Sequence, residues 1–594
     1  MKELYCEYNG YRQLILKLEK KYSEREQIIN KLFESGDTKA IQRRVESIRA
    51  KVKKALTDEA LYDGKFEIIN AGTIIEKGYS IEKVLLNASG HFSIPVNVYV
   101  PQGNGEKRHP AILHPIGHCP EGKKHADTQR LLANFAMHGI ICATFDPVCQ
   151  GERALLPDTA IKEWFTGVPD DLRAVAMHGQ LGNIAYIRGK NNAAIFIRDA
   201  KIVLDYLCSR SDVDSNNIGC TGHSGGGTQT NFISSIDDRI KYVSPVQCMS
   251  KMRAVLPEGI GDSEQSLLGI SADEGFDYAD QAWACFPKPY LLSIAINDQF
   301  PYEGAKEAEE ELRKLYSITG HSDSFEVAFS VSRHKNCYES RMAAYSFFYK
   351  HMLGSKEPVS EIDINILDEE LNCANGKTNE LPQADYLTAV KNLLNKASSS
   401  SGNIRSKLTA LICEKENQRF AQWDADVDAF FKSTDTKVAV YIGPDREITS
   451  HITGNVIIVT PWGMDSTYDK EIPIYDAESC TAYAANVYGF NVCRERVQEV
   501  LKVVVEYAAK GYELSLIGEG AGSIVALYAG CISRCKTILI DVYKNYKELF
   551  DEDVYFIPET NVLDGVLEVG DTSDIIAASD VILTSKTDLG LLFS

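Results

Sequence analysis

The sequence lacks a membrane span, an excess of basic residues and any metal-type spacing of cysteines. No apolar run reaches the roughly 20 residues that cross a bilayer, and the first 22 residues contain no uninterrupted apolar segment of signal-peptide type. A net charge of −20 argues against a nucleic-acid partner, which would require a basic patch. The 15 cysteines include no CxxC pair, so reduced thiols are the simplest interpretation. We expect a cytoplasmic protein with no metal, no cofactor, no nucleic acid and no membrane contact.

The length of the chain and the changes in residue pattern along it indicate several domains. At 594 residues the chain is too long for one core, and its 44% apolar and 25% charged residues are typical of a globular protein. Residues 11–55 contain no proline and carry apolar residues at helical spacing, which predicts an N-terminal helical segment over residues 1–60. The stretch FSIPVNVYVP (92–101) alternates apolar and other residues, as in a strand buried on one face.

After Pro101 the pattern becomes strand, loop and helix in repetition. AILHPIG (111–117) and IICATFDP (140–147) are short apolar runs typical of buried parallel strands, with a helical stretch between them. Antiparallel strands followed by alternating strands and helices predict an α/β fold, with a mixed, mostly parallel sheet and helices on both faces. The expected division is a helical segment, a catalytic domain, a linker with connector helices and a second, smaller α/β domain, at 1–60, 61–355, 356–415 and 416–594.

The stretch GHSGG (222–226) has the setting of a nucleophile elbow. It follows a predicted strand and opens the predicted helix TQTNFISSI. The sharp turn requires small neighbours, and the helix N-terminus directs backbone N–H groups toward a developing oxyanion. These features predict that Ser224 is a nucleophile, and a glycine-rich turn with a spectator serine is the alternative.

A nucleophilic serine needs a base and a carboxylate that orients the base. In this kind of fold the order along the chain is serine, acid, histidine. Asp298 ends the predicted strand PYLLSIAIN, and His334 follows the last predicted strand, FEVAFSV. Glu303 and Glu258 remain alternatives for the acid. His321 precedes the final strand and is interpreted as an ordinary loop residue.

The loop HPIGHCPEGK (114–123) follows the first parallel strand, where a second oxyanion donor is needed. We expect the backbone of Gly117 or His118 to supply it, beside that of Gly225. The His118 side chain could alternatively contact the substrate or be a buried structural histidine.

Four further residues are candidates for substrate binding. Arg153 follows the next strand, and a structural ion pair is the favoured interpretation of it. Trp164 and Trp283 lie in long segments that should cover the carboxyl edge of the sheet, where simple packing is favoured over stacking on a sugar ring. His223 is the fourth candidate, because it precedes the nucleophile.

Together, GHSGGGTQT, the GH…GK loop, DPVCQGER, RDAKIVLDYL…SDVDSNNIG and AINDQFPYEG resemble the acetyl xylan esterase-like branch of the α/β-hydrolases. That branch is related to dienelactone hydrolases and to the catalytic domains of prolyl oligopeptidases. The resemblance covers residues 60–355 and implies Ser224 as nucleophile, His334 as base and Asp298 as acid. It also implies hydrolysis of small acyl esters, often acetyl groups on carbohydrates, without a metal. Cys149 in DPVCQGER departs from the pattern, because a glycine is expected there.

The second half repeats several of these motifs. IIVTPWG (457–463) parallels AILHPIG, and ELSLIGEGAGSIVALYAG parallels the elbow, with Gly520 in the place of Ser224. The stretch 570–585 resembles 275–293, and little chain follows it for a base-bearing loop. We expect a degenerate hydrolase domain without the triad, which could shape the entrance, bind substrate or mediate a homo-oligomer. The alternative is a Rossmann-like domain with GEGAG as a phosphate loop and Asp541 as its acid.

The pattern as a whole predicts a serine hydrolase that cleaves carboxylic esters of carbohydrates or small molecules through an acyl-enzyme. Acyl transfer to another alcohol would use the same residues if water were excluded. A prolyl oligopeptidase-like peptidase would share the triad, but the first 60 residues are too short and too helical for a gating β-propeller. A non-catalytic binding protein is the remaining alternative, and a complete Ser, Asp and His set argues against it.

Overall fold

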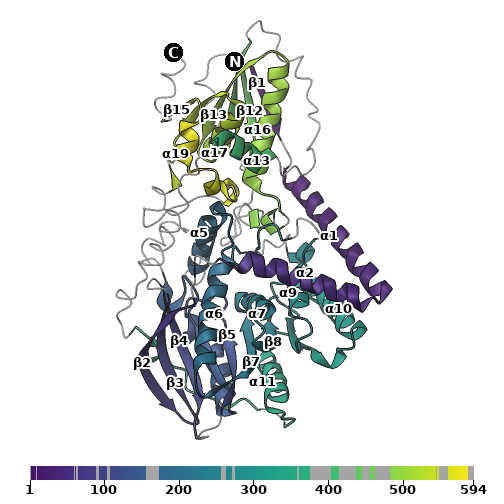
Figure 1. The fold of residues 1–594 in the computed structure, drawn as a ribbon, viewed down its shortest axis with the longest axis vertical. Helices are drawn as coiled ribbons and strands as arrows, with labels where there is room; N and C mark the ends of the chain where they lie inside the picture. Colours follow the sequence, from purple (N-terminus) through teal and green to yellow (C-terminus); the bar gives the residue numbers. More distant parts are fainter. Residues whose placement is uncertain are drawn as a thin grey trace.

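The computed structural model contains two mainly parallel sheets, each with its own helices (Figure 1). It describes residues 2–7, 10–58, 61, 64–88, 92–103, 108–154, 173–255, 262–270, 275–357, 360–374, 403–413, 436–443, 455–461, 482–483, 485–487, 489–542, 545–546 and 559–585. Within these ranges every helix is too short or too polar to cross a bilayer. Thirteen of the cysteines in the described part of the chain are free thiols.

The first sheet has nine strands in the order β10-β9-β8-β7-β5-β6-β4-β3-β2. Strands β2, β3 and β4 pair antiparallel with one another, β4 pairs antiparallel with β6, and the remaining neighbours are parallel. This is the predicted α/β-hydrolase arrangement, and it is confirmed. The strands are β2 Phe66–Glu76, β3 Tyr79–Ala88, β4 Phe92–Pro101, β5 His109–His114, β6 Ile141–Phe145, β7 Val213–His223, β8 Ile240–Val246, β9 Tyr290–Ala295 and β10 Phe325–Ser330.

Helices cover both faces of this sheet. The helices pack in two groups with separate hydrophobic cores. One core includes α2, α6, α7, α9 and α10, and the other includes α3 and α11. The strands in the centre are buried along their whole length, as their continuous apolar runs predict. The helices of this unit are α3 Ala126–Met137, α5 Arg173–Ile187, α6 Ala193–Ser209, α7 Gly225–Ile236, α8 Met252–Val255, α9 Tyr278–Cys285, α10 Tyr302–Ile318 and α11 Tyr338–Phe348.

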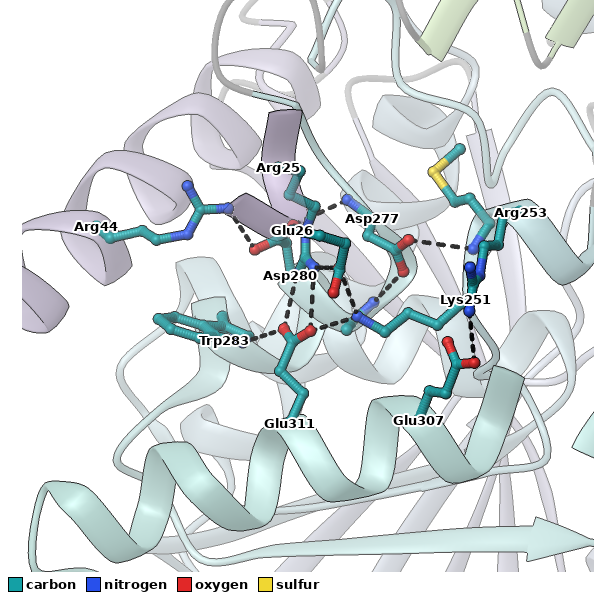
Figure 2. A network of polar contacts seen from close by, with 12 residues as sticks. Arg25, Glu26, Arg44, Lys251, Arg253, Asp277, Asp280, Trp283, Glu307 and Glu311 are labelled. Atoms are coloured by element: carbon teal, nitrogen blue, oxygen red, sulfur yellow. Dashed lines mark hydrogen bonds and ion pairs between the residues drawn. The ribbon is translucent and has the colours of Figure 1, made fainter. Parts of the chain in front are cut away.

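The N-terminal helices α1 (Gly10–Ser35) and α2 (Thr38–Leu56) are fastened to the first unit by a buried ion-pair network (Figure 2). Arg25 of α1 bonds to Asp280 of α9 at 2.6 Å and to Glu311 of α10 at 2.6 Å. Arg44 of α2 reaches the other oxygen of Asp280 at 3.0 Å. Burial alone would destabilise these charges, so the carboxylates that surround each guanidinium are required for the packing.

The second sheet has six parallel strands in the order β1-β12-β11-β13-β14-β15. Its edge strand β1 comes from the start of the chain, whereas the sequence suggested only a helical segment there. Three of its helices, α13, α16 and α17, pack against one another. The elements are β1 Lys2–Glu7, β11 Lys437–Ile442, β12 Asn455–Thr460, β13 Glu513–Glu519, β14 Lys536–Ile540 and β15 Val581–Thr584, with α13 Ile404–Cys413, α16 Val492–Ala509, α17 Ala521–Ser533 and α19 Thr572–Ala577.

The two units share a hydrophobic core that includes residues of α5 and of the second sheet. The backbone N–H of Gly565 donates to the carbonyl of Tyr186 in α5 at 2.9 Å, and that of Gly269 donates to Asn486 at 2.7 Å. On the other side, Lys17 of α1 pairs with Glu495 of α16 at 3.3 Å. The second unit therefore rests on α5 and on the first N-terminal helix.

Candidate active site

Ser224 lies at the turn between β7 and α7 with φ 57° and ψ −125°. This left-handed backbone is strained for a serine and brings the side chain out of the turn. A Cβ atom on Gly222 would lie 2.5 Å from the carbonyl oxygen of Gly226, and one on Gly226 would lie 2.4 Å from that of Pro115. The glycines that flank the serine are thus required by close backbone contacts.

A chain of hydrogen bonds joins the three residues that the sequence selected. Nε2 of His334 lies 2.7 Å from Oγ of Ser224, and Nδ1 of His334 lies 2.6 Å from Oδ1 of Asp298. Asp298 follows β9 and is 3% exposed at its side chain, whereas that of His334 is 21% exposed. A buried carboxylate on one ring nitrogen and a hydroxyl on the other is the arrangement that activates a serine.

The alternatives for the acid and the base lie elsewhere. Glu303 is exposed in the first turn of α10, and Glu258 lies outside the described residues. His321 precedes a short 3₁₀ turn, and its ring packs on Phe286 with the centroids 5.1 Å apart. The carboxylate that bonds to His334 is that of Asp298.

The loop after β5 packs directly on the nucleophile. A Cβ atom on Gly117 would lie 3.2 Å from that of Ser224 and 3.3 Å from the backbone nitrogen of Gly225. Gln150 donates to the Gly117 carbonyl at 2.8 Å, and Gln229 donates to that of Ile116 at 3.0 Å. These two glutamines hold the loop in place, and nothing in the sequence pointed to this role.

Gln247 holds the histidine loop in a similar way. It follows β8 with φ 48°, and its Oε1 accepts a hydrogen bond from the backbone N–H of Lys335 at 2.7 Å. The same oxygen lies 3.1 Å from Nε2 of His223, whose ring centroid is 4.7 Å from that of His334. Burial, with the neighbouring His334, lowers the pKa of His223 to about 3, so this ring stays neutral beside the base.

The loop after β6 is fixed by buried charges. Lys123 pairs with Asp146 at 2.7 Å and also with Glu152, and a Cβ atom on Gly151 would lie 2.4 Å from the Asp146 carboxylate. Cys149 adopts φ 67°, which explains why a glycine is expected at that position. Arg153 bonds to Asp199 at 2.5 Å and is 5% exposed, so the ion-pair interpretation fits it and the substrate interpretation does not.

Trp283 packs in the interior of the unit, as the favoured packing interpretation has it, so it is not available to bind a substrate. It is fully buried in α9, stacks on Phe33 at 5.8 Å between ring centroids and donates to Glu311 at 2.8 Å. Its indole fills the interface with α1, because the N-terminal helices cover this face of the unit (Figure 2). Trp164 lies outside the described residues.

His118 belongs to a buried polar cluster beside the elbow. Its Nε2 lies 2.5 Å from Oε1 of Glu264, and its Nδ1 lies 3.6 Å from Oδ2 of Asp262. Burial opposes a charge on this ring, but the two carboxylates outweigh it and raise the pKa of His118 to about 9. The second ring of the group, His178 on α5, has its centroid 5.3 Å from that of His118.

The second unit contains a turn of the same shape. Gly520 stands between β13 and α17 with φ 53° and ψ −120°. A Cβ atom on Gly518 would lie 2.5 Å from the Gly522 carbonyl, which repeats the contact between Gly222 and Gly226. The geometry of the elbow is therefore present without a side chain at its apex.

The strand order corrects one part of the predicted repeat. The neighbours of β7 are β5 and β8, and those of β13 are β11 and β14. Strand β11 therefore occupies the position of β5, and β12, which carries the motif IIVTPWG, occupies that of β6. The resemblance of 570–585 to 275–293 extends to detail, because α9 and α19 both begin with a capping box, at Asp277 and Asp571.

Comparisons with known proteins find similar chains that are named as hydrolases and esterases. No family model matches the sequence. The chain is 26% identical over 272 residues to "Putative hydrolase YtaP" of Bacillus subtilis (strain 168), which covers 46% of this chain and 87% of that protein. Among solved structures it is similar to "Methylesterase BT1017" (20% identity, 62% of this chain and 79% of that one, TM-score 0.49) and to an acetyl xylan esterase from Paenibacillus sp. R4 (16%, 52% and 93%, TM-score 0.36). Because both TM-scores are below 0.5, the fold is assigned from the strand order and not from these two similarities.

Proposed function

We propose that this α/β-hydrolase chain is a serine esterase that cleaves carboxylic esters through an acyl-enzyme. The observation that carries the proposal is the continuous hydrogen-bonded path from Ser224 through His334 to Asp298 at a strained elbow. A spectator serine in a glycine-rich turn would not require a base and an orienting carboxylate on two other loops.

The reaction follows from the positions of these groups. Ser224 Oγ attacks the ester carbonyl carbon while Nε2 of His334 takes the hydroxyl proton, and Asp298 stabilises the resulting imidazolium. The oxyanion accepts hydrogen bonds from the backbone N–H groups of Gly225 and of the segment 117–118. His334 then gives its proton to the leaving alcohol. Water, activated by the same ring, releases the acid and restores the serine.

The substrate class is proposed from the motifs that the sequence shares with the acetyl xylan esterase-like branch. The similar solved structures carry names of the same kind, namely acetyl xylan esterase, methylesterase and glucuronoyl esterase. Short acyl esters of carbohydrates or small alcohols are therefore the first compounds to test, and a cytoplasmic location would favour small imported molecules over polymers.

The second unit is proposed as a degenerate hydrolase. Its elbow carries Gly520, and the only histidine in residues 416–594 is His451, which precedes β12 rather than following the last strands. Its contact with α5 supports a role in shaping the first unit rather than in chemistry.

The test is fluorophosphonate labelling of the purified chain, with the label located by mass spectrometry. The wild type is expected to carry one label, on Ser224, and Ser224→Ala is expected to carry none. Ser235→Ala, which alters a buried serine on the same helix, should label like the wild type. A wild type that stays unlabelled while folded would overturn the proposal.

A panel of esters then identifies the substrate. Turnover of p-nitrophenyl acetate and of acetylated sugars by the wild type, and its loss in Ser224→Ala, supports the acyl class. Turnover of a peptide amide at a comparable rate would favour a peptidase instead, and product formation only in the presence of a second alcohol would favour acyl transfer.

A further inference from the structure

Three side chains beside the elbow bring metal-binding atoms together from three separate segments. His118 comes from the loop after β5, His178 from α5 and Glu264 from the segment 262–270. One ring nitrogen of His118, one of His178 and a carboxylate oxygen of Glu264 all lie within 4.8 Å of one another. The side chains are 12%, 1% and 2% exposed.

The hydrogen bonds around the cluster direct lone pairs toward its centre. Nε2 of His178 lies 2.9 Å from the carbonyl oxygen of Val148, which can only accept, so this nitrogen carries the ring proton. In the neutral ring, Nδ1 is then an acceptor, and it faces Oε1 of Glu264 at 3.4 Å, a second acceptor. This buried Nδ1 makes no hydrogen bond to any residue in the described ranges.

His118 lies between two carboxylates. Its Nδ1 lies 3.6 Å from Oδ2 of Asp262, a carboxylate that is held in turn by Gln265 at 3.0 Å. Its Nε2 hydrogen-bonds to the same Oε1 of Glu264 at 2.5 Å, so an ion that displaces this proton would be held by both residues. While the proton is in place, Nδ1 of His178 still faces that carboxylate without a donor. A cation between the three acceptors satisfies all of them.

We propose that His118, His178 and Glu264 bind one divalent transition-metal ion, with zinc as the best match. Two imidazoles and one carboxylate are a known catalytic zinc set that leaves a fourth position open. The outer ring nitrogens, on Val148 and toward Asp262, have the partners that typically orient histidine ligands. Ligands at zinc distances lie about 3.3–3.5 Å apart in a tetrahedron, so His178 and Glu264 already fit and His118 needs to withdraw by about 1 Å.

The site borders the proposed oxyanion donors. Nε2 and Cε1 of His118 lie 3.3 Å from the position of a Cβ atom on Gly225. An ion held there fixes the loop 114–123 through His118 and adds positive charge beside the ester oxygens. Metal binding is a property of the chain itself and does not depend on the proposed esterase activity.

The experiment measures metal directly. The full chain is stripped with a chelator, dialysed, and titrated with Zn²⁺ and Co²⁺, with metal content measured by elemental mass spectrometry. One ion per chain is expected, and X-ray absorption of the zinc form should show two imidazole ligands. Glu264→Gln and His118→Ala are expected to weaken binding by more than about 100-fold.

His138→Gln is the matched control. His138 lies at the end of α3, before β6, and therefore at the opposite edge of the sheet. This variant should bind metal like the wild type. No uptake by the folded wild type, equal uptake by His118→Ala, or an absorption spectrum without imidazole would each overturn the proposal. Fluorophosphonate labelling of the stripped protein separates the two ideas, because a labelled Ser224 without bound metal leaves the esterase proposal intact.

Discussion

The turns at Ser224 and Gly520 have the same backbone geometry, but only the first carries a side chain at its apex. Ser224 and Gly520 differ by only a few degrees in φ and ψ, and each turn is closed by glycines that contact the same carbonyl positions. The residue after the next strand also has a positive φ in both units, at Gln247 and Asp541. The turn is therefore maintained by packing and does not require a nucleophile.

The difference lies in what surrounds each turn. Around Ser224, loops from three other strands bring in the His334 ring, the Asp298 carboxylate and the segment 114–123. Around Gly520, the described residues are the ends of the neighbouring strands and the start of helix α17. Gly520 itself is the N-cap of this helix. The proposed catalysis therefore depends on the loops, as expected for sites at the carboxyl edge of an α/β sheet.

The largest effect is expected from making the first elbow like the second. Ser224→Gly should lower ester turnover by at least about 10⁴-fold, because the attacking oxygen is removed. Stability should remain near that of the wild type, since glycine tolerates a positive φ. Steady-state kinetics and thermal unfolding measure the two quantities.

The reverse change is the control. Gly520→Ser should gain neither turnover nor a fluorophosphonate label, because the described part of this unit contains no histidine to act as the base. A label at position 520 in this variant would show that the second unit still holds a working base, and the interpretation as a degenerate hydrolase would be wrong.

A second prediction concerns the buried network that fastens the N-terminal helices to the first unit. Asp280→Asn should lower the free energy of unfolding of that unit by about 3–5 kcal/mol, because the Arg25 and Arg44 guanidiniums lose a shared carboxylate. Denaturant unfolding followed by hydrogen exchange should show the loss in α1 and α2 and little change in α16 and α17. Equal losses in both units would indicate that they unfold as one.

The same network predicts a pH dependence. Burial opposes ionisation of Glu311, but Arg25 and Lys251 outweigh it and hold the pKa of this carboxyl well below its usual 4.5. Its stabilisation is therefore complete above about pH 4.5 and is lost as the pH falls below that value. The difference in the free energy of unfolding between pH 7 and pH 4 should be smaller in Glu311→Gln than in the wild type. An unchanged difference would argue against this carboxylate as a source of acid sensitivity.

A smaller effect should be shared by both units. Gly222→Ala and Gly518→Ala each place a methyl group 2.5 Å from a carbonyl oxygen, which should cost about 1–3 kcal/mol of stability. Thermal unfolding of the two variants measures this cost. A clear loss at Gly222 with none at Gly518 would mean that the second turn is looser than its geometry indicates.

The smallest effects are expected at the two residues that follow the equivalent strands β8 and β14, and they should differ between the units. Gln247→Gly removes the acceptor that holds Lys335 beside His334 and should lower turnover by about 10–100-fold, an effect of loop positioning. Asp541→Gly removes the strain of a positive φ and should stabilise the chain by up to about 1 kcal/mol without changing turnover. Kinetics of both variants at saturating and limiting substrate provide the comparison.

That Ser224, His334 and Asp298 lie together could be predicted because each is marked by local sequence and by chain order. Ser224 stands in a motif, and Asp298 and His334 follow recognisable strands. Gln150, Gln229 and Gln247 carry no such mark, since their role is to hold loops that meet only in the folded chain. The cluster at His118 was missed for the same reason, because its ligands come from three distant segments.

The second sheet shows a different limit. Strands β11 and β12 are both short apolar runs that end near proline and glycine, so the sequence alone assigned the wrong one to the position beside the elbow. Packing was the favoured interpretation of Trp283, but its partner could not be predicted, because burial by the N-terminal helices depends on the remote pairing of Arg25 with Asp280. Partner choice between distant elements is set by tertiary packing rather than by local pattern.

The position of strand β1 determines when the second sheet can form during synthesis. Lys2 pairs with Asn455, so β1 has no partner until the ribosome has passed β12. At about 5–20 residues per second, the wait is on the order of 20–90 s, during which the first unit and helices α1 and α2 can already fold. The nascent chain therefore carries an unpaired strand while everything between β1 and β12 is made, and a partly made protein is expected to depend on chaperones that cover β1.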